Sequence, residues 1–408
     1  MNTSRDICAD VCTDVCADVF AYGPAGYRDL MAQLGQPAYR AQQLAGWLWT
    51  HGAADYDEMS NLPAVLREQL AEVAVLRRGN VLVRQESTDG TRKYLVQFAD
   101  GVAVECVGIP DEPGTLPTQQ RSPKHLTVCV SSQAGCALGC SFCATGRAGF
   151  TRDLLPGEIA EQIRLVAADF GVRAGNVVVM GQGEPFLNFD AVVEGLRIAN
   201  GSDSQGGLGI GARHITVSTA GIVNGIRRFS ALPEQFTLAV SLHSAVQATR
   251  DRLMPGVSGQ PLSALADALI DYREQSGRRA SLEYAVVSGV NDTPAEVDAL
   301  CDFARRVHAH VNLIGINPID RGCTGSGGGA SAAPDIHATP AMQGAPGAPA
   351  TTPTPAQRTT DAALRSVAAT LRRSGIEVSI RRSRGADIDA ACGQLAGRGR
   401  YGRPGADI

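Results

Sequence analysis

Residues 129–146 read CVSSQAGCALGCSFCATG, and this stretch holds four of the eleven cysteines in the chain. Cys136, Cys140 and Cys143 have the spacing C-x-x-x-C-x-x-C, and Cys129 lies seven residues before the first of them. A structural zinc site normally takes four ligands, and a [4Fe–4S] cluster also usually takes four thiolates. Three thiolates leave one iron of a cluster open to a small molecule. The spacing therefore favours an iron–sulfur cluster with one open iron, and a zinc site completed by a distant ligand is the alternative.

The sequence around this stretch alternates between apolar strand-like runs and helical segments. The expected strands are HLTVCVS, NVVVMG, HITVST, FTLAVSLH, ASLEYAVV and VNLIGIN, and the expected helices lie near 156–170, 188–200, 261–276 and 294–309. Such alternation is typical of βα units around a parallel sheet. We therefore predict an α/β fold whose core, residues 111–320, is an incomplete (β/α)6 barrel. In such folds the functional residues lie at the carboxyl ends of the strands.

Four segments flank the predicted barrel. Residues 1–24 contain the repeat CADVCTDVCADV and are expected to form a disordered tail. Residues 25–110 have a helical pattern and then a period-two pattern with turns, which predicts a small α+β accessory domain ending in a β-meander. Residues 321–360 are rich in Gly, Ala, Pro and Thr and are expected to be a disordered insert. Residues 361–408 form a C-terminal segment with a helix, a strand and the motif RGADIDAACGQLAG.

The length, amino-acid composition and charge of the chain limit which class of protein it can be. The chain has 408 residues and is 44% hydrophobic, which is enough for a sizeable core. It lacks a run of about 18 apolar residues, so no membrane span or membrane partner is expected. Its N-terminus carries acids where a signal peptide would be apolar, which indicates a cytoplasmic protein with reduced cysteines. The net charge of −4 gives no argument for a nucleic-acid partner, and local arginine clusters are first interpreted as solvated surface.

Several further motifs are compatible with binding or with simple packing. The motif GQGEP at 181–185 follows a strand, where its glycines allow a close approach to a ligand and its carboxylate can pair with an amine. Polar residues also end two later strands at 217–221 and 239–244, although His243 taken alone is better interpreted as a satisfied core histidine. Cys392 lies between small residues that admit a bulky group, but a lone cysteine is more often a core residue. Glu105, on an alternating strand, would ordinarily face solvent.

The chain resembles the RlmN/Cfr family of radical S-adenosylmethionine (SAM) RNA methyltransferases, and most closely its RlmN branch. The resemblance is carried, in order, by YRAQQLAGWLWTHG, DEMSNLP, CVSSQAGCALGCSFCATG, MGQGEPFLN, ITVSTAG, AVSLHSA, GINP and RGADIDAACGQLAG. It implies a radical SAM barrel, an RNA-contacting N-terminal domain, and a [4Fe–4S] cluster held by Cys136, Cys140 and Cys143. It also implies that two molecules of SAM are used per turnover.

The resemblance implies residue roles as well. Cys392 would be the S-methylcysteine intermediate, Cys129 would form a transient disulfide with it, and Glu105 would be the proton acceptor. The implied SAM contacts are Gly183, Glu184, Ser218, Ser241, Leu242, His243 and Asn317. The expected reaction is methylation of adenosine C2 in 23S rRNA and in tRNA, by a monomer that receives electrons from a flavodoxin or ferredoxin. The arginines at 77–78, 372–373 and 381–384 then become candidate phosphate contacts.

Three alternatives remain open from the sequence. The same scaffold could methylate C8 of adenosine, as in the Cfr branch. The protein could also be a radical SAM enzyme for a small molecule, which the helical N-terminal region argues against. Finally, it could be a non-catalytic metal-binding RNA protein.

Overall fold

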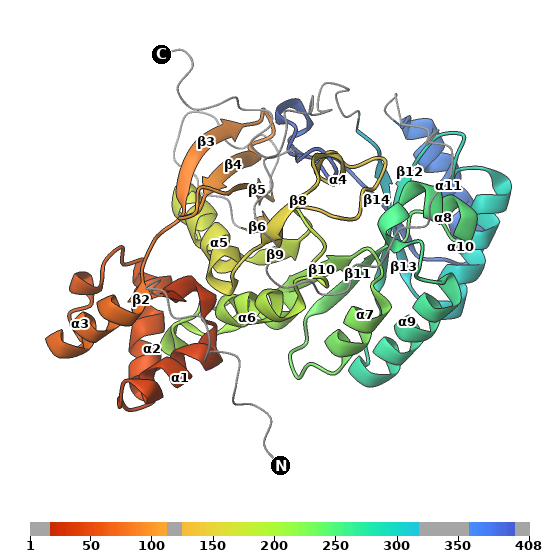
Figure 1. Cartoon of the computed structure of the whole chain (residues 1–408). Coiled ribbons are helices and arrows are strands. Elements are labelled where there is room, and N and C mark those ends of the chain that lie inside the picture. The colour runs from red at the N-terminus through yellow and green to blue at the C-terminus, as the bar shows by residue number, and fades with distance from the viewer. Residues whose placement is uncertain (1–16, 112–124, 318–358, 396–408) are drawn as a thin grey trace, which may run out of the picture.

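The computed structural model describes residues 17–111, 125–317 and 359–395. Its main feature is a ten-stranded mixed sheet in the order β14-β13-β12-β11-β10-β9-β6-β5-β4-β3 (Figure 1). The strands are β3 (Asn80–Glu86), β4 (Arg92–Gln97), β5 (Ala103–Pro110), β6 (Leu126–Val130), β9 (Asn176–Val179), β10 (Ile215–Thr219), β11 (Thr237–Ser241), β12 (Ser281–Val286), β13 (His310–Gly315) and β14 (Val378–Arg381). From β6 to β14 every neighbouring pair is parallel, which confirms the predicted α/β barrel core.

Helices connect the parallel strands and cover one face of the sheet (Figure 1). They are α5 (Pro156–Phe170), α6 (Phe189–Asn200), α7 (Val223–Ser230), α8 (Gln247–Leu253), α9 (Leu262–Ser276), α10 (Pro294–Val307) and α11 (Asp361–Arg373). Their ends follow local sequence rules. Thr293 caps α10 and Pro294 occupies its first turn, while α5 ends at Gly171 with a positive φ of 65°. The sequence thus specifies both the strands and the connections between them.

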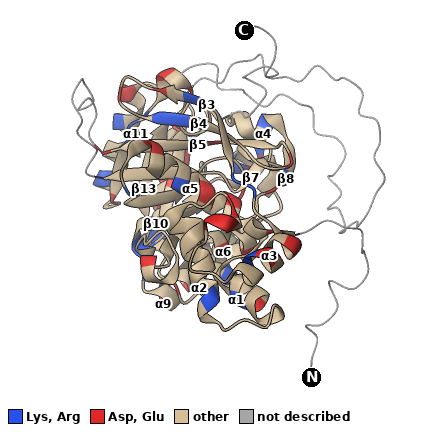
Figure 2. Ribbon diagram, turned by 90° about the vertical axis from the view of Figure 1, so that its left-hand side faces the viewer, with Lys and Arg blue, Asp and Glu red and all other residues tan. Residues whose placement is uncertain are grey.

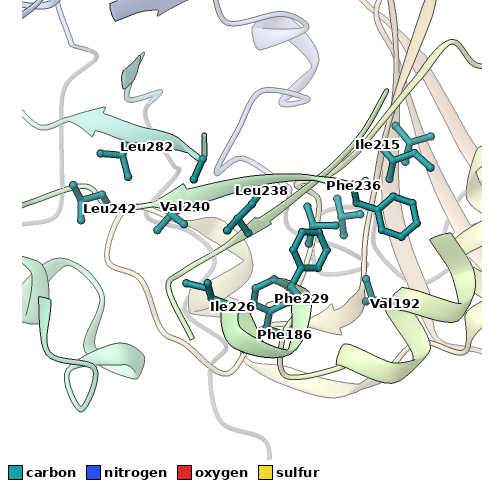
Figure 3. Close-up of a cluster of buried hydrophobic side chains, with 14 of the residues drawn as sticks. Phe186, Val192, Ile215, Ile226, Phe229, Phe236, Leu238, Val240, Leu242 and Leu282 are labelled. Atoms are coloured by element: carbon teal, nitrogen blue, oxygen red, sulfur yellow. The ribbon is translucent and has the colours of Figure 1, made fainter. Parts of the chain in front are cut away.

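Side chains alternate between the two faces of each strand. Those on the outer face are apolar and pack beneath the helices, as Figure 3 shows for Leu238 and Val240 of β11 against Phe186, Phe229 and Phe236. The inner face is more polar. Its residues include Lys93, Glu105, Cys129, Ser218, Ser241, Glu283 and Asn312. The sheet therefore separates a packed core from a surface that carries chemical groups.

The N-terminal region divides differently from the prediction. Helices α1 (Pro24–Gln33), α2 (Tyr39–Ala45) and α3 (Ala64–Val73), with a π-helical turn at Gly46–His51, share a core of their own. The strands β3, β4 and β5 instead join the barrel sheet, because β5 pairs antiparallel with β6. The predicted 25–110 domain is thus a helical module followed by a meander that extends the barrel.

The predicted tail also ends earlier than residue 24. Val19 and Phe20 are buried in the core of the helical module, and the Phe20 ring lies 5.3 Å from that of Trp49. Short strands β1 (Ala17–Asp18) and β2 (Ala74–Val75) pair in parallel beside them. Residues 1–16, with the cysteine repeat, lie outside the described residues.

Most of the predicted insert, 321–358, also lies outside the described residues. The chain is described again from Thr359, whose hydroxyl donates to the carbonyl of Val286 and accepts from the backbone N–H of Ile316 at 3.0 Å. Thr360 then caps α11. After β14, the segment 384–395, with the 3-10 turn η8 (Ala386–Ile388), returns to the side of the sheet that carries β4 (Figure 1). Among the described residues, none of the helices has the length and apolar character needed to cross a membrane.

Candidate active site

The three clustered cysteines lie on the loop between β7 (Gln133–Gly135) and α4 (Ala144–Ala148). Cys136 donates its backbone N–H to Gly149, which precedes β8 (Phe150–Asp153), at 2.8 Å. Gly135 has a φ of 79°, and a Cβ there would lie 2.0 Å from the carbonyl oxygen of Gly149. Glycine is required at this point because of both the backbone conformation and this close approach. The loop is therefore fixed in position by its neighbouring hairpin.

Burial changes the chemistry of these thiols. It raises the pKa of Cys136 to about 11 and that of Cys140 well above its usual value, and the charges of neighbouring cysteines add to both shifts. Thiolates in such a place need positive charge, and bound metal ions supply it. No group of three His, Cys, Asp or Glu side chains in residues 17–111, 125–317 and 359–395 converges on a single ion. A cuboidal cluster instead bridges thiolates through separate irons, so three cysteines on one loop fit that group.

A residue that the sequence interpretation missed lies beside this loop. Arg250 on α8 is fully buried, and its guanidinium donates to the carbonyls of Ala220, Ser241 and Leu242, at the ends of β10 and β11. Burial lowers its pKa to about 10, while the nearby Cys140 acts in the opposite direction. A fixed cation thus lies next to the proposed anionic cluster. In the sequence, Arg250 is one of several arginines in a helical pattern, and its burial depends on two distant strands.

The GQGEP loop follows β9 and contacts the cluster loop through Gln133. The Glu184 carboxylate is buried and accepts from the Thr219 hydroxyl at 2.7 Å and from the backbone N–H of Ala220 at 2.6 Å. Burial raises its pKa, and these hydrogen bonds oppose that shift. Gly183 has a φ of 101°, and a Cβ there would lie 2.6 Å from Cβ of Gln133. The structure therefore places Gly183 and Glu184 directly behind the cysteine loop.

The other expected SAM contacts lie at the ends of the following strands. The hydroxyls of Ser218 and Ser241 are 3.5 Å apart, and Leu242 is fully buried beside them. Asn317 follows β13 and donates to the Ser383 hydroxyl at 3.1 Å. Ser218 and Ser241 thus lie together at the carboxyl ends of β10 and β11, while Asn317 follows β13, two strands further along the sheet, and its role in binding SAM stays a prediction.

His243 forms a buried turn after β11. Its φ is 55°, and its Nδ1 accepts from the backbone N–H of Ala285 at 3.0 Å. Burial, and then the charge of Arg250, lower its pKa to about 3, so the ring is neutral with its proton on Nε2. The ring packs edge-on against that of Phe142, next to Cys143, and the two ring centroids are 4.7 Å apart. His243 thus joins the end of β11 to the cluster loop.

The C-terminal segment brings Cys392 to the same place. The backbone N–H of Ala144 donates to Gly393 at 2.7 Å, and the Thr145 hydroxyl donates to the carbonyl of Leu395 at 2.6 Å. Cys392 is exposed to solvent, yet the surrounding protein desolvates it enough to raise the pKa of its thiol. An accessible thiol beside the cluster loop is suited to meet a large substrate.

Cys129 lies on the inner face of β6 and packs with Ala390 and Leu395 of this segment. Burial, and then the neighbouring Cys392, raise its pKa to about 12. The structure therefore brings together two thiols that are 263 positions apart in the sequence, at 129 and 392. The seven described cysteines are all free thiols, so no disulfide links this pair in the structure.

Glu105 lies on β5, on the same side of the sheet. Its side chain has no exposed surface and pairs with Lys93 on β4, whose Nζ is 3.1 Å from Oε1. Its backbone is also fixed, because its N–H donates to Gln182 and its carbonyl accepts from Ser131. The general expectation that an acid on an alternating strand faces solvent is therefore wrong here.

Two of the candidate phosphate-binding arginines have internal partners. Arg78 pairs with Glu161 at 2.9 Å, and Arg384 pairs with Asp89 at 2.9 Å. Asp89 also accepts from the backbone N–H of Gly385, which fixes the Cys392 segment to the β3–β4 turn. Figure 2 shows basic residues elsewhere, at the β3–β4 edge and on α4. Arg78 and Arg384 therefore stabilise the fold and do not offer a free basic surface.

Comparison with known proteins identifies this arrangement. Residues 130–304 match the Radical SAM superfamily, and residues 20–76 match the ribosomal RNA large subunit methyltransferase N-terminal domain. The chain is 41% identical over 361 residues to a probable dual-specificity RNA methyltransferase RlmN of Thermosynechococcus vestitus, covering 88% of this chain and 93% of that protein. It is 42% identical over 368 residues to the same kind of protein from Gemmatimonas aurantiaca, covering 90% and 88%. The chain belongs to the RlmN family.

A solved structure supports the same conclusion. A radical SAM methyltransferase from Sphaerobacter thermophilus is 36% identical, with a TM-score of 0.75, and the match covers 93% of this chain and 99% of that one. The RlmN-family chain is therefore a radical SAM methyltransferase that uses a [4Fe–4S] cluster and SAM. The match over residues 20–76 coincides with the helical module and excludes the meander, in agreement with the division seen in the fold.

Proposed function

We propose that this protein methylates C2 of adenosine in 23S rRNA and in tRNA, with Cys392 as the methyl carrier. The RlmN relatives are named as dual-specificity RNA methyltransferases, which supports RNA as the substrate. The observation that carries the proposal is the position of the Cys392 segment, which is hydrogen-bonded to the cluster loop and packed against Cys129. A carrier thiol must meet both the methyl source and the substrate, and an exposed thiol beside the cluster loop satisfies both needs.

The chemistry explains why a protein thiol is used. C2 of adenine is electron-poor and does not attack the electrophilic methyl group of SAM. The cluster and SAM, when bound, supply the radical chemistry that overcomes this mismatch. Cys136, Cys140 and Cys143 would hold the cluster. Gly183, Glu184, Ser218, Ser241, Leu242, His243 and Asn317 would line the SAM site.

Product release would then use the two thiols. Once the carbon carried by Cys392 is bonded to C2, Glu105 takes the C2 proton. Cys129 attacks the sulfur of Cys392, so that an S–S bond forms and the C–S bond breaks. The carbon leaves with the bonding electron pair and is protonated to a methyl group. In this step the Cys129 thiol and the thioether sulfur of Cys392 are oxidised to a disulfide while the departing carbon is reduced, and two electrons from an external reductant then restore both thiols.

The proposal also covers how the RNA is bound, which protein donates electrons, and the compartment in which the enzyme acts. The target base would leave its stack to reach Cys392, and the RNA would be bound by shape and phosphate contacts. We propose flavodoxin or ferredoxin as the electron donor, with the protein acting as a cytoplasmic monomer. Binding of RNA is expected to weaken as salt rises.

The decisive experiment is digestion of 23S rRNA after reaction with the anaerobically reconstituted protein, followed by mass spectrometry of the methyladenosine isomers. C2-methyladenosine is expected, and only C8-methyladenosine would assign the alternative activity. The Cys392→Ala variant should bind the cluster but transfer no methyl group to RNA. Full turnover by this variant would contradict the carrier role.

The Cys129→Ala variant should leave RNA covalently attached to the protein. Cys106 provides a matched control, because it is a buried cysteine on the neighbouring strand whose side chain packs on the opposite face of the sheet. The Cys106→Ser variant should therefore release methylated RNA normally. Release of free methylated RNA by Cys129→Ala would show that another thiol resolves the adduct.

A further inference from the structure

We propose that Arg250 is a positioning residue for electron transfer, whose fixed charge makes the bound [4Fe–4S] cluster easier to reduce. The inference rests on one part of the proposed function, the binding of the cluster by Cys136, Cys140 and Cys143. It does not depend on which atom of the RNA is methylated. Its basis is a fully buried guanidinium that connects the cluster loop to the ends of two strands that carry expected SAM contacts.

Backbone carbonyls hold the guanidinium in place. Its Nη1 donates to Ser241 and Leu242 at 3.1 and 2.6 Å, and its Nη2 donates to Ala220. Gly221 makes room for it, because this glycine has a φ of 94° and a Cβ there would lie 2.9 Å from Nη2. The Nε atom is buried and has no hydrogen-bond partner among the described residues. Since a buried donor is costly to leave unpaired, one donor is available to a bound group.

The helix that carries this arginine, α8, also holds the cluster loop. Just after the helix, the backbone N–H of Gly256 donates to the carbonyl of Leu138 at 2.9 Å. The last residue of α8, Leu253, accepts in turn from the backbone N–H of Ser141 at 3.0 Å. These two bonds lie on either side of Cys140 in the sequence. The arginine and this cluster ligand are therefore attached to the same rigid part of the backbone.

The charges of Arg250 and Cys140 act on each other. Burial lowers the pKa of Arg250 to about 10, while the charges of Cys140 and of nearby carboxylates oppose that shift. At neutral pH the guanidinium is therefore still protonated. Burial, and then the neighbouring cysteines, raise the pKa of Cys140 well above its usual value, and the Arg250 charge acts against them. A permanent cation thus acts on a cluster ligand from inside the protein.

Reduction places one more electron on the cluster. Three thiolates already make this group anionic, so reduction increases the negative charge of a buried site. A cation at a fixed position stabilises the more negative state, and it does so more strongly inside a protein than in water. No bond forms or breaks in this step, because one electron leaves the external reductant and enters the cluster. Arg250 should therefore raise the reduction potential of the cluster.

The reduction potential can be measured without RNA and without SAM. The full chain, reconstituted anaerobically, would be titrated with titanium(III) citrate and redox mediators, and electron paramagnetic resonance would quantify the reduced cluster. Arg250→Met should make reduction at least about tenfold less favourable, which is a fall in potential of about 59 mV for a one-electron couple. Arg250→Lys keeps the positive charge, so its reduction equilibrium should stay within about threefold of the wild type.

Matched variants separate the buried charge from other effects. Arg252 is exposed on the same helix, and it donates to the Thr249 hydroxyl at 3.3 Å. Arg252→Met should leave the potential unchanged, because solvent screens this charge. Arg250→Gln is a second neutral variant if Arg250→Met does not fold, and it should lower the potential in the same way. Circular dichroism and iron content establish that each variant is folded and loaded before its potential is compared.

The possible failures are distinguishable. If the wild type holds no cluster, the proposed binding of the cluster by the three cysteines fails. If the cluster forms and the neutral Arg250 variants keep the wild-type potential, only the role of Arg250 is overturned. If Arg250→Lys lowers the potential as far as Arg250→Met does, the contacts of the guanidinium set the potential and its charge does not, which also contradicts the inference.

Discussion

At the scale of single residues, Cys129 and Cys392 differ in a way that suits their proposed order of action. Cys392 is exposed, as a group that meets substrate must be, whereas Cys129 is buried behind it. Burial, and then the proximity of Cys392, raise the pKa of Cys129 to about 12. A thiol of this kind is almost fully protonated at neutral pH, so it does not attack prematurely.

This difference predicts the pH dependence of product release. The thiolate is the attacking form, and below a raised pKa its fraction grows about tenfold per pH unit. Decay of a preformed adduct in the wild-type protein should therefore accelerate between about pH 7 and 9, measured by quenched single turnover. The Cys106→Ser protein should show the same profile. A rate that does not change with pH would mean that a nearby base takes the proton of Cys129.

Gly183 allows a second prediction with a close control. An alanine Cβ at 183 would lie 2.6 Å from Gln133 at a φ of 101°, so Gly183→Ala should displace the GQGEP loop and reduce SAM binding at least about tenfold. Gly289 has a φ of 75° but no atom within 4 Å of the Cβ position. Gly289→Ala should therefore cost only about 1 kcal/mol of stability and leave SAM affinity unchanged. Equilibrium binding and thermal unfolding measure both effects, and equal SAM affinities in the two variants would refute the role of the loop.

At the scale of secondary-structure elements, local sequence patterns predicted which segments form strands but not how all of them pair. The period-two pattern at 80–109 gave three strands, and the structure contains β3, β4 and β5 there. Their place in the barrel sheet depends on pairing between Val107 and Cys129, which are separated by 22 residues. Arg250 was missed for a similar reason, because its partners are carbonyls at the ends of β10 and β11. A non-local contact leaves no periodic signal in the sequence.

The same meander also binds the segment 384–395, which carries Cys392 and is called the carrier segment below. The Asp89 carboxylate accepts from Arg384 at 2.9 Å and from the backbone N–H of Gly385 at 3.1 Å. Asp89→Ala should free this end of the segment, with a loss of about 1–2 kcal/mol of local stability. Hydrogen exchange over 384–395 should increase, and methylation of Cys392 should slow several-fold.

A carboxylate elsewhere provides the control for that prediction. Asp302 on α10 forms an exposed ion pair with Arg305, and its side chain is 81% exposed. Asp302→Ala should change neither hydrogen exchange in the carrier segment nor methylation of Cys392. If Asp89→Ala behaves like this control, the β3–β4 turn does not position Cys392.

At the scale of the whole molecule, the helical module and the barrel are joined by a largely buried cation, Arg78, whose side chain is 12% exposed. Arg78 lies between α3 and β3, and it donates to the carbonyls of Leu48 and Ala53 in the module and to Glu161 on α5 of the barrel. Its guanidinium also lies 5.5 Å from the centre of the Phe20 ring. The sequence offered Arg78 as a surface arginine, because burial of a single charged side chain depends on how the two parts pack. Because Arg78 contacts both parts, it helps to fix the position of the module relative to the barrel.

This connection predicts a change that the chain's own tryptophans can report. The two tryptophans, Trp47 and Trp49, both lie in the helical module, so their fluorescence follows this part alone. Arg78→Met removes hydrogen bonds to Leu48 and Ala53 and leaves Glu161 with Arg164, so we expect about 2–3 kcal/mol of destabilisation of the module. The fluorescence transition in urea should shift to lower denaturant than the circular-dichroism transition, which is dominated by the barrel. Arg67→Met removes only a pair with Asp57, whose side chain is 91% exposed, and should change the midpoint little. If both variants unfold like the wild type, or if the two signals stay coincident, the module is held to the barrel by its apolar contacts and not by Arg78.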